Sequence, residues 1–509
     1  MASPLQNITV AAPGFRGLNT QDSPLSLDTS FASIADNCVI DQYGRIGARK
    51  GRVLLTENQA ILGTSAGTTA IKEHVNSTGG KTIFSTGNNL IFSGTSTLVD
   101  ETPAAYTVTG DDWKIVNFNF HCYFFQRDHA PLVYSDHAGA ITTVATHPHA
   151  TGTPPNGNEA LAAFGRLWVG DITGNTSTIY WSDLLDGTKW SGGSTGSLDL
   201  TNVWPTGYDE VVALAAHNGF LIIFGKNSIV IYQGATSPST MSLYDTIANV
   251  GCAHRDSVQN VGTDLLFLSN EGLRSLGRVI QEKSSPVRDV SKNVRTDLLS
   301  LIPLQTVGIK SAYSPEEAFY LLSLPTSSVV YCFDMRVPLE DGSHRVTVWT
   351  GVNLKAFDRL DNGTLYMGNV DGINTYSGYL DDTSTYQVNY FTNPLDFGDS
   401  SRLKILKELD LTFIGGQNTP VTVNWGYDYT QSYTKEVITL QNALLSEFNV
   451  AEYNVATSEY GGASIILDRK KVRPTGSGNV VTLGLTVTVS GVPLSLQELN
   501  IQALIGRML

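Results

Sequence analysis

The chain has 509 residues; 41% of them are hydrophobic, 16% are charged, and the formal net charge is −14. This length predicts about three domains, or two where one of them is a long all-β unit. The charged fraction lies below the roughly 25% of typical soluble domains, which is compatible with large subunit interfaces. A protein that grips nucleic acid needs an excess of clustered cations, and this chain has no such excess. The acidic balance leaves open both ordinary acidic solubility and an acidic surface that DNA slides past without binding.

The cysteines and the N-terminus exclude further classes. The four cysteines form no C-x-x-C pair, so neither a zinc ribbon nor a disulfide framework is predicted. We expect buried free thiols, in a protein assembled in a reducing cytoplasm. The first residues, MASPLQNITV, contain no cationic segment and no long apolar segment. Neither a secretory signal nor stable insertion in a membrane is therefore expected. The cysteines are Cys38, Cys122, Cys252 and Cys332.

Residues 1–60 differ in character from the rest of the chain. The segment GFRGL at residues 14–18 precedes a polar linker with Pro24, a short apolar run at residues 31–39, and a basic cluster. We expect an extended arm that docks on another surface. Its last part, residues 45–55, is a candidate for a strand that closes a ring made by later elements.

Residues 61–390 contain a recurring pattern. Seven segments each consist of an apolar strand, a polar turn and a second apolar strand. Successive segments begin 39 to 54 residues apart, and a four-stranded β-propeller blade takes about 40 to 50 residues. Helical periodicity is scarce, with one short helix expected at residues 291–301. The segments begin near Thr82, His121, Arg166, Phe220, Asp264, Ala318 and Thr364.

Radial packing explains why such sheets would form a ring. One small sheet cannot bury both of its faces alone, whereas blades around an axis bury each face against the next blade. We therefore predict a β-propeller of six or seven blades. A generic array of β-sandwiches with chance spacing is the alternative.

The repeat stops near residue 390, and longer alternating strands come after it. Alternation over residues 408–413, 421–425, 480–489 and 496–505 is typical of a β-sandwich with one buried face per sheet. A helix is also expected at residues 435–448. The predicted fold class is thus all-β, with an N-terminal arm (1–60), a β-propeller (61–390) and a C-terminal β-sandwich-like domain (391–509).

No catalytic, cofactor-binding or metal-binding residue is predicted, and no cofactor is expected. His121, His129 and His137 recur at equal spacing, but no companion cysteine or glutamate motif accompanies them. Residues 358–363 lack the spacing of an EF-hand loop and are expected to form turns. A glycoside hydrolase is the enzymatic alternative, because propellers host many sugar-cleaving enzymes. Such an enzyme needs two carboxylates at a defined separation, for which Asp183, Asp209 and Glu210 are candidates.

Two basic clusters, GRIGARKGR and SRLKILKE, are candidates for contacts with an acidic neighbouring subunit. The alternative is a solvated strand edge, where Lys and Arg discourage unwanted pairing. DNA binding comes third because of the overall charge. The candidate contact residues are Arg45, Arg49, Lys50, Arg52, Arg402, Lys404 and Lys407.

The N-terminal stretch from Gly14 to Arg52 resembles the opening of tail nozzle proteins of short-tailed bacteriophages, also called tail tubular protein B or packaged-DNA stabilisation protein. Later stretches resemble the same family: FGKNSIVIYQGAT from Phe224, and residues 391–413 and 480–501. The match spans most of the chain as a patchwork. In the first stretch it is carried by Gly17, Leu18, Asn19, Asn37, Asp41, Gly44, Arg45, Arg49, Lys50 and Gly51.

The resemblance implies a non-enzymatic virion protein. Family members form six-fold rings below the adaptor ring under the portal and make the terminal channel for DNA. They help retain packaged DNA, and they receive tail fibres or tailspikes and a plug or needle. The expected partners are thus further copies of the chain in a hexamer, the adaptor (head-to-tail connector), fibres or spikes, the plug, and passing double-stranded DNA. The alternative is a propeller glycosidase, depolymerase or glycan-binding module of a phage tail.

Overall fold

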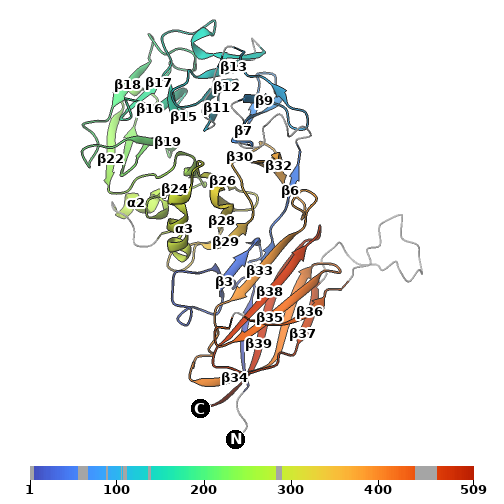
Figure 1. The fold of residues 1–509 in the computed structure, drawn as a ribbon. Helices are drawn as coiled ribbons and strands as arrows, with labels where there is room; N and C mark the ends of the chain where they lie inside the picture. Colours follow the sequence, from blue (N-terminus) through green and yellow to red (C-terminus); the bar gives the residue numbers. More distant parts are fainter. Residues whose placement is uncertain are drawn as a thin grey trace.

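The computed structural model describes residues 5–55, 67–87, 90–104, 106, 112–135, 139–282, 289–430, 432–441 and 467–508. Over these residues the protein is built mainly of β-strands in two bodies, a ring of small sheets and an elongated sandwich (Figure 1). The two α-helices in these ranges are α2 (Leu276–Glu282) and α3 (Arg295–Leu301). None of the described helices is long and apolar enough to cross a membrane.

The ring is a seven-bladed β-propeller, which confirms the predicted fold class. Each predicted hairpin forms the second and third strands of one blade. The first four blades are β7 (Ala70–Val75) to β10 (Val99–Asp100), β11 (Lys114–Phe118) to β14 (Ala140–Thr143), β15 (Gly157–Ala163) to β18 (Gly196–Asp199), and β19 (Val211–His217) to β22 (Ser242–Ala248). The last three blades are β23 (Gln259–Asn260) to β25 (Gly272–Ser275), β26 (Lys310–Ser314) to β29 (Arg345–Thr350), and β30 (Ala356–Arg359) to β32 (Gly372–Tyr376).

The hairpin strands of the blades explain why the recurring apolar pattern could be recognised in the sequence. They are β8 (Lys81–Gly87), β9 (Leu90–Ser93), β12 (His121–Phe125), β13 (Leu132–Ser135), β16 (Arg166–Ile172), β17 (Thr178–Trp181), β20 (Phe220–Gly225), β21 (Ser228–Gln233), β24 (Leu265–Ser269), β27 (Phe319–Leu324), β28 (Val329–Asp334) and β31 (Leu365–Asn369). Most of their residues are buried, since both faces pack on neighbouring blades. In the Asn218–Gly219 turn both residues have positive φ (49° and 81°), as a two-residue type I′ hairpin turn requires.

The seventh blade is completed by a strand from the beginning of the chain. Strand β6 (Arg52–Leu54) pairs antiparallel with β32, so the prediction of a closing strand within residues 45–55 is confirmed for its C-terminal part. The innermost strands of successive blades lie side by side around the axis, and β30 of the last blade contacts β7 of the first. The ring therefore closes on itself.

The second body is a sandwich of two sheets that uses both ends of the chain. One sheet contains β1 (Leu5–Ala11), β4 (Cys38–Ile40), β5 (Ile46–Ala48), β34 (Arg402–Gly415), β37 (Leu467–Val472) and β39 (Leu494–Met508). The other contains β2 (Gly17–Leu18), β3 (Phe31–Asp36), β33 (Tyr386–Thr392), β35 (Pro420–Tyr427), β36 (Thr434–Thr439) and β38 (Val481–Val489). Residues 1–60 were expected to form an extended arm. Their described strands instead pair within the chain's own sandwich and last blade.

One sheet and one hydrophobic core join the two bodies. Strand β29 of the sixth blade pairs in parallel with β2 and β3, so a single ten-stranded sheet runs from the propeller into the sandwich. The largest buried apolar cluster likewise extends from the sandwich strands into the fifth and sixth blades and includes Leu298 of α3. The helix predicted at residues 291–301 is confirmed by α3. The helix predicted at 435–448 is wrong for 435–439, which lie in β36; residues 442–448 lie outside the described ranges.

An ion pair beside α3 predicts a measurable acid sensitivity. The Asp341 carboxylate accepts hydrogen bonds from Ser343 and lies 2.5 Å from Lys292 Nζ. Burial alone would raise the pKa of Asp341, but these bonds lower it to about 2. Because the folded pKa lies below the ordinary value of 3.8, this carboxylate stabilises the fold above pH 3.8, and the contribution is lost as the pH falls towards 2.

We expect Asp341→Asn to lower the free energy of unfolding by about 1 kcal/mol at pH 7, after allowance for partial exposure. The difference from the wild type should vanish as the pH approaches 2, in urea titrations at a series of pH values. Lys292→Met should reproduce the loss at pH 7. A difference that is constant with pH would contradict this assignment.

Candidate functional site: the propeller axis

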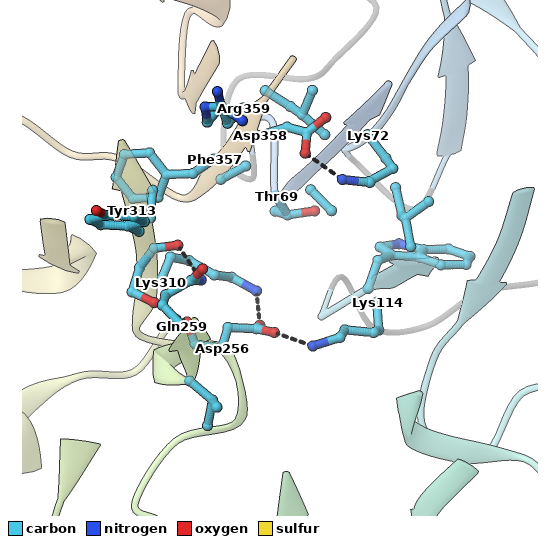
Figure 2. Close-up of a pocket in the computed structure, with 18 residues that line it drawn as sticks. Thr69, Lys72, Lys114, Asp256, Gln259, Lys310, Tyr313, Phe357, Asp358 and Arg359 are labelled. Carbon is cyan, nitrogen blue, oxygen red and sulfur yellow. Dashed lines mark hydrogen bonds and ion pairs between the residues drawn. The ribbon is translucent and has the colours of Figure 1, made fainter. Parts of the chain in front are cut away.

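A polar cavity of about 360 Å³ lies on the propeller axis (Figure 2). Its walls come from the innermost strands of blades one, two, five, six and seven. A second cavity of about 380 Å³, between blades two, three, four and five, shares Lys72 and Lys114 with the first. The axis is thus lined by charged side chains from segments far apart in the sequence, a common place for ligand sites in propellers.

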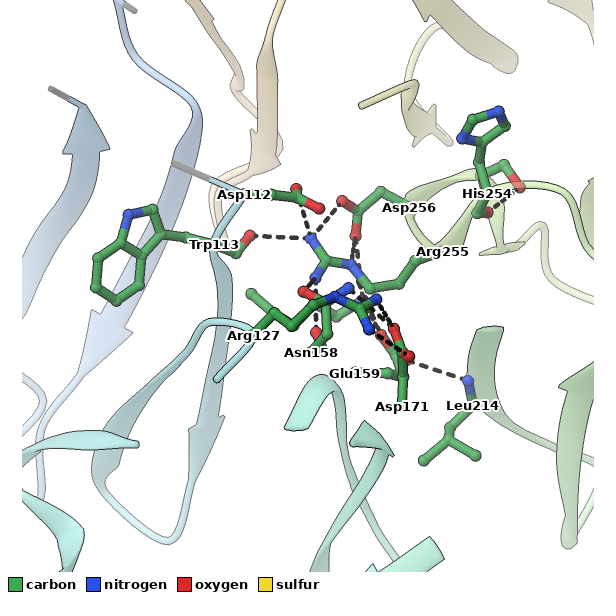
Figure 3. Close-up of polar contacts among 12 residues, drawn as sticks. Asp112, Trp113, Arg127, Asn158, Glu159, Asp171, Leu214, His254, Arg255 and Asp256 are labelled. Atoms are coloured by element: carbon green, nitrogen blue, oxygen red, sulfur yellow. Dashed lines mark hydrogen bonds and ion pairs between the residues drawn. The ribbon is translucent and has the colours of Figure 1, made fainter. Parts of the chain in front are cut away.

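Arg255 is the centre of an ionic cluster at this axis (Figure 3). It lies in a short 3₁₀ turn before blade five, and its side chain is 6% exposed. The guanidinium donates to Asp112 and Asp256, both at 2.9 Å, and lies 3.9 Å from Glu159. It also donates to the backbone carbonyl of Asn158 at 2.6 Å. One cation thereby holds together the segments that lead into blades two, three and five.

Two lysines complete the cluster. Lys114 Nζ lies 3.3 Å from Glu159 and 3.4 Å from Asp256. Lys310 Nζ lies 2.6 Å from Asp256 and 3.2 Å from Asp112. We call these six residues the axial cluster. It consists of Asp112, Lys114, Glu159, Arg255, Asp256 and Lys310, three cations with three carboxylates.

Burial and pairing act against each other on the pKa values in the axial cluster. Desolvation disfavours ionised Asp256, but Arg255, Lys310 and Lys114 outweigh it and hold the Asp256 pKa well below its usual value. The pKa of Asp112 is lowered in the same way, chiefly by Arg255. Burial raises the pKa of Glu159, because its two cationic neighbours only partly offset desolvation. Paired charges of this kind fix the geometry of the segments that carry them.

A second ion pair faces the same cavity from the ring closure. Lys72 Nζ of β7 donates to Asp358 of β30 at 2.6 Å, and Asp358 also accepts the backbone N–H of Glu73 at 2.7 Å. These contacts join the first blade to the seventh.

Most of the predicted contact residues have partners inside the chain. Arg45 pairs with Asp41 at 2.7 Å, Lys50 with Glu317, and Arg52 with Asp371 at 3.2 Å. These pairs hold the N-terminal strands to neighbouring turns. Arg45, Lys50 and Arg52 stay predictions as subunit contacts, although each already has an acidic partner.

Arg49 corrects the prediction for the first cluster. Its side chain is 3% exposed, and its two terminal nitrogens donate to both carboxylate oxygens of Asp381, at 2.8 and 2.7 Å. Its Nε donates to Asn37 at 3.0 Å, and its charge lies over the Tyr386 ring. A buried, fully paired arginine is not available to a neighbouring subunit. It instead holds the link between β32 and β33, where the chain leaves the propeller.

In the second basic cluster, SRLKILKE, one of the three predicted contact residues is buried and two are exposed. Lys404 is buried and donates to the backbone carbonyl of Asp399, which corrects its assignment as a surface contact; burial lowers its pKa. Arg402 pairs with Asp399 at 3.0 Å and remains exposed, as does Lys407. The two exposed members stay predictions.

The three predicted carboxylates of a glycoside hydrolase all have partners inside the chain. Asp183 accepts hydrogen bonds from Ser194 within one loop, Asp209 holds the β20–β21 turn, and Glu210 pairs with Lys226. The prediction of buried free thiols is confirmed for all four cysteines. Across the described ranges no three His, Cys, Asp or Glu side chains gather in a way that could hold a metal ion. His137 lies outside these ranges.

Sequence reasoning missed the axial cluster, although one signal was present. Five of the seven innermost strands carry at least one charged residue, and they read AIKEHV, KIVNF, GNEALAA, KSAYS and AFDR. Charged residues that recur in the first strand of several blades point to the common axis. Spacing motifs find only residues that are close in sequence.

Comparisons with known proteins concern the fold. No family model matches the chain, and no curated protein matches it. Among solved structures, the WD40 β-propeller domain of Doa1 is 12% identical, with a TM-score of 0.38 over 64% of this chain and 95% of that one. The WD40 domain of Neurospora crassa Pan2 is 9% identical, with a TM-score of 0.37 over 69% and 96%. YCF48 bound to D1 peptide is 12% identical, with a TM-score of 0.36 over 65% and 95%.

Proposed function

We propose that the protein is a structural subunit of the tail nozzle of a short-tailed bacteriophage. In this role six copies form a ring below the adaptor. The ring surrounds the exit channel for DNA, helps retain packaged DNA, and receives tail fibres or tailspikes and a plug. The observation that carries the proposal is the ten-stranded sheet shared by the propeller and the sandwich. A subunit that must hold a fixed place in a ring under load needs domains that do not hinge, and a shared sheet and core provide this.

Three of the residues that carry the N-terminal resemblance lie at this junction. Gly17 has φ 78° and lies so close to β29 that a Cβ would stand 2.5 Å from the Val346 carbonyl oxygen. Asn37 donates to the backbone carbonyl of Gln387 and accepts from Arg49. Asn19 donates to Asn293 just before α3. These three residues join the two domains, which supports a shared architecture with that family.

The surface and site chemistry agree with this role. The net charge of −14 gives passing DNA little to bind. The carboxylates of the axial cluster are all ion-paired, and no observation favours the hydrolase alternative. We therefore propose that the protein is non-enzymatic. We also propose that it is assembled in the host cytoplasm and ends up in the tail of the virion.

Imaging of virions tests the proposal. Antibodies against the chain should label the distal end of the tail, and averaged images should show a six-fold ring there that accommodates the propeller and the sandwich. Absence of the chain from purified virions, or a place away from the tail axis, would exclude this role. Cleavage of bacterial polysaccharide by the isolated chain, abolished by one Asp or Glu substitution, would favour the hydrolase instead.

A further inference from the structure

A polar groove of about 490 Å³ crosses the propeller between the fourth and fifth blades, away from the axis. Its volume falls in the range of about 300 to 1,000 Å³ that is usual for ligand sites. The walls come from the β18–β19 connection, the β20–β21 and β24–β25 turns, and the segment after β22. We call it the amide groove. It is lined by Thr206, Tyr208, Lys226, Asn227, Asn249, Val250, Gly251, Ser269, Asn270 and Glu271.

One aromatic ring stands open to solvent at this groove. Tyr208 is 66% exposed, the highest value among the exposed large hydrophobic side chains of the described residues. Its hydroxyl lies 3.2 Å from Glu210 and 3.4 Å from Thr176, so one edge of the side chain is held in place. The ring itself offers an apolar face next to polar walls.

Three asparagine side chains offer donors and acceptors beside that ring. The amides of Asn227, Asn249 and Asn270 are exposed and have no hydrogen-bond partner among the described residues. Each amide offers two N–H donors and one carbonyl acceptor. A ligand with many hydroxyl groups, each both donor and acceptor, matches this set.

The groove is prearranged by a buried carboxylate. Asp209, next to Tyr208, is 2% exposed and accepts hydrogen bonds from the backbone N–H groups of Lys226 and Asn227, both at 2.9 Å. At Gly251 the backbone passes so close that a Cβ would lie 2.3 Å from the Lys226 carbonyl. The backbone that carries Tyr208 and Asn227 is thus held on one support, which lowers the entropy cost of binding.

The charged side chains that line the groove indicate which class of ligand it can bind. Lys226, its only lining cation, is paired with Glu210, and its only lining carboxylate, Glu271, lies 2.9 Å from Arg274. No free cation is left among these lining residues for a phosphate or sulfate, and no pair of carboxylates faces the groove to cleave a glycosidic bond. We infer that the amide groove binds a neutral oligosaccharide, without turnover, by stacking a sugar ring on Tyr208 and bonding its hydroxyls to the asparagines.

This inference stands on the groove alone and is independent of the proposed place in a ring. It is tested with the purified full chain on an array of neutral and anionic bacterial oligosaccharides. The best neutral ligand is then titrated in solution by saturation-transfer NMR. Tyr208→Ala should weaken binding at least about tenfold, since the stacking face is lost. Asn249→Asp keeps a residue that tolerates the left-handed backbone (φ 63°) but replaces donors with a charge, and should also weaken binding.

Tyr244→Ala is the matched control. Tyr244 belongs to blade four, is 55% exposed, and does not line the groove. The Tyr244→Ala substitution should leave the affinity for the oligosaccharide unchanged. Three results would overturn the inference: no neutral oligosaccharide bound by the wild type, equal binding by Tyr208→Ala, or binding of anionic glycans only.

Discussion

Arg255→Met is expected to lower the free energy of unfolding of the propeller by about 3 to 5 kcal/mol. Removal of one partner from a buried ion-paired group leaves the opposite charges buried without compensation, which is far costlier than loss of an exposed pair. Here Asp256 and Glu159, whose side chains are largely buried, would keep only two lysines as partners. Asp112 is 53% exposed and can be solvated by water. Urea unfolding followed by tryptophan fluorescence measures the effect, because every tryptophan except Trp425 lies in the propeller.

The matched control is Arg359→Met, which removes an exposed pair with Glu316 facing the same axis. It should change stability by less than about 1 kcal/mol. The pH dependence has a definite sign. In the wild type the Asp256 pKa is held low in the folded state, so the benefit of the pair is present above the ordinary aspartate pKa of 3.8 and is lost below it. In the variant the buried carboxylates take up protons in the folded state, so the deficit should shrink as the pH falls from 7 to 4. An equal loss in both variants would show that the axial cluster has no special role.

Arg49→Met is expected to cost about 3 to 5 kcal/mol and to loosen the connection between the domains. The substitution leaves Asp381 and Asn37 without their partner, at the point where the chain passes from the seventh blade into the sandwich. We expect limited proteolysis to cleave between Tyr376, the end of β32, and Tyr386, the start of β33. The cut should appear on a denaturing gel as a C-terminal fragment that begins in this segment.

Arg52→Met, from the same basic cluster, is the control. Its pair with Asp371 is partly exposed, so the change should stay within about 1 kcal/mol and leave the protease pattern unaltered. Because two domains need not unfold together, calorimetry should accompany the proteolysis. A wild-type proteolysis pattern for Arg49→Met would mean that the shared sheet alone holds the domains.

The hairpins of the propeller were predictable because their signal is local. In FLIIFGKNSIVIYQ the two apolar runs, the turn between them and the resulting strands β20 and β21 all lie within 14 residues. Burial on both faces makes such strands continuous apolar runs, which recur once per blade. The outermost strands were not predicted, since Val99–Asp100 and Gly196–Asp199 are short and polar and their pairing depends on the strand beside them.

The sandwich and the axial cluster depend on contacts that no short window contains. Leu5 lies opposite Leu504 in the β1–β39 pair, and the apolar alternation of each strand gives no indication of its distant partner. Arg49 illustrates the same limit. A basic cluster is typical of a surface. The guanidinium of Arg49 is nevertheless buried, because it pairs with Asp381, more than 300 residues later in the chain. Lys50 and Arg52 beside it conform to the surface pattern.

The position of the first strands has a consequence for biosynthesis. Strand β6 emerges from the ribosome early but cannot pair until β32 has been made, and β1 must wait for β39, the last strand of the chain. At about 5 to 20 residues per second, β1 and β6 stay without their native partners while the several hundred residues that separate them from β39 and β32 are made. A premature stop that removes only β39 would leave β1, β5 and β34 without that partner strand. Such incomplete chains would expose unpaired strand edges, which chaperones and proteases recognise.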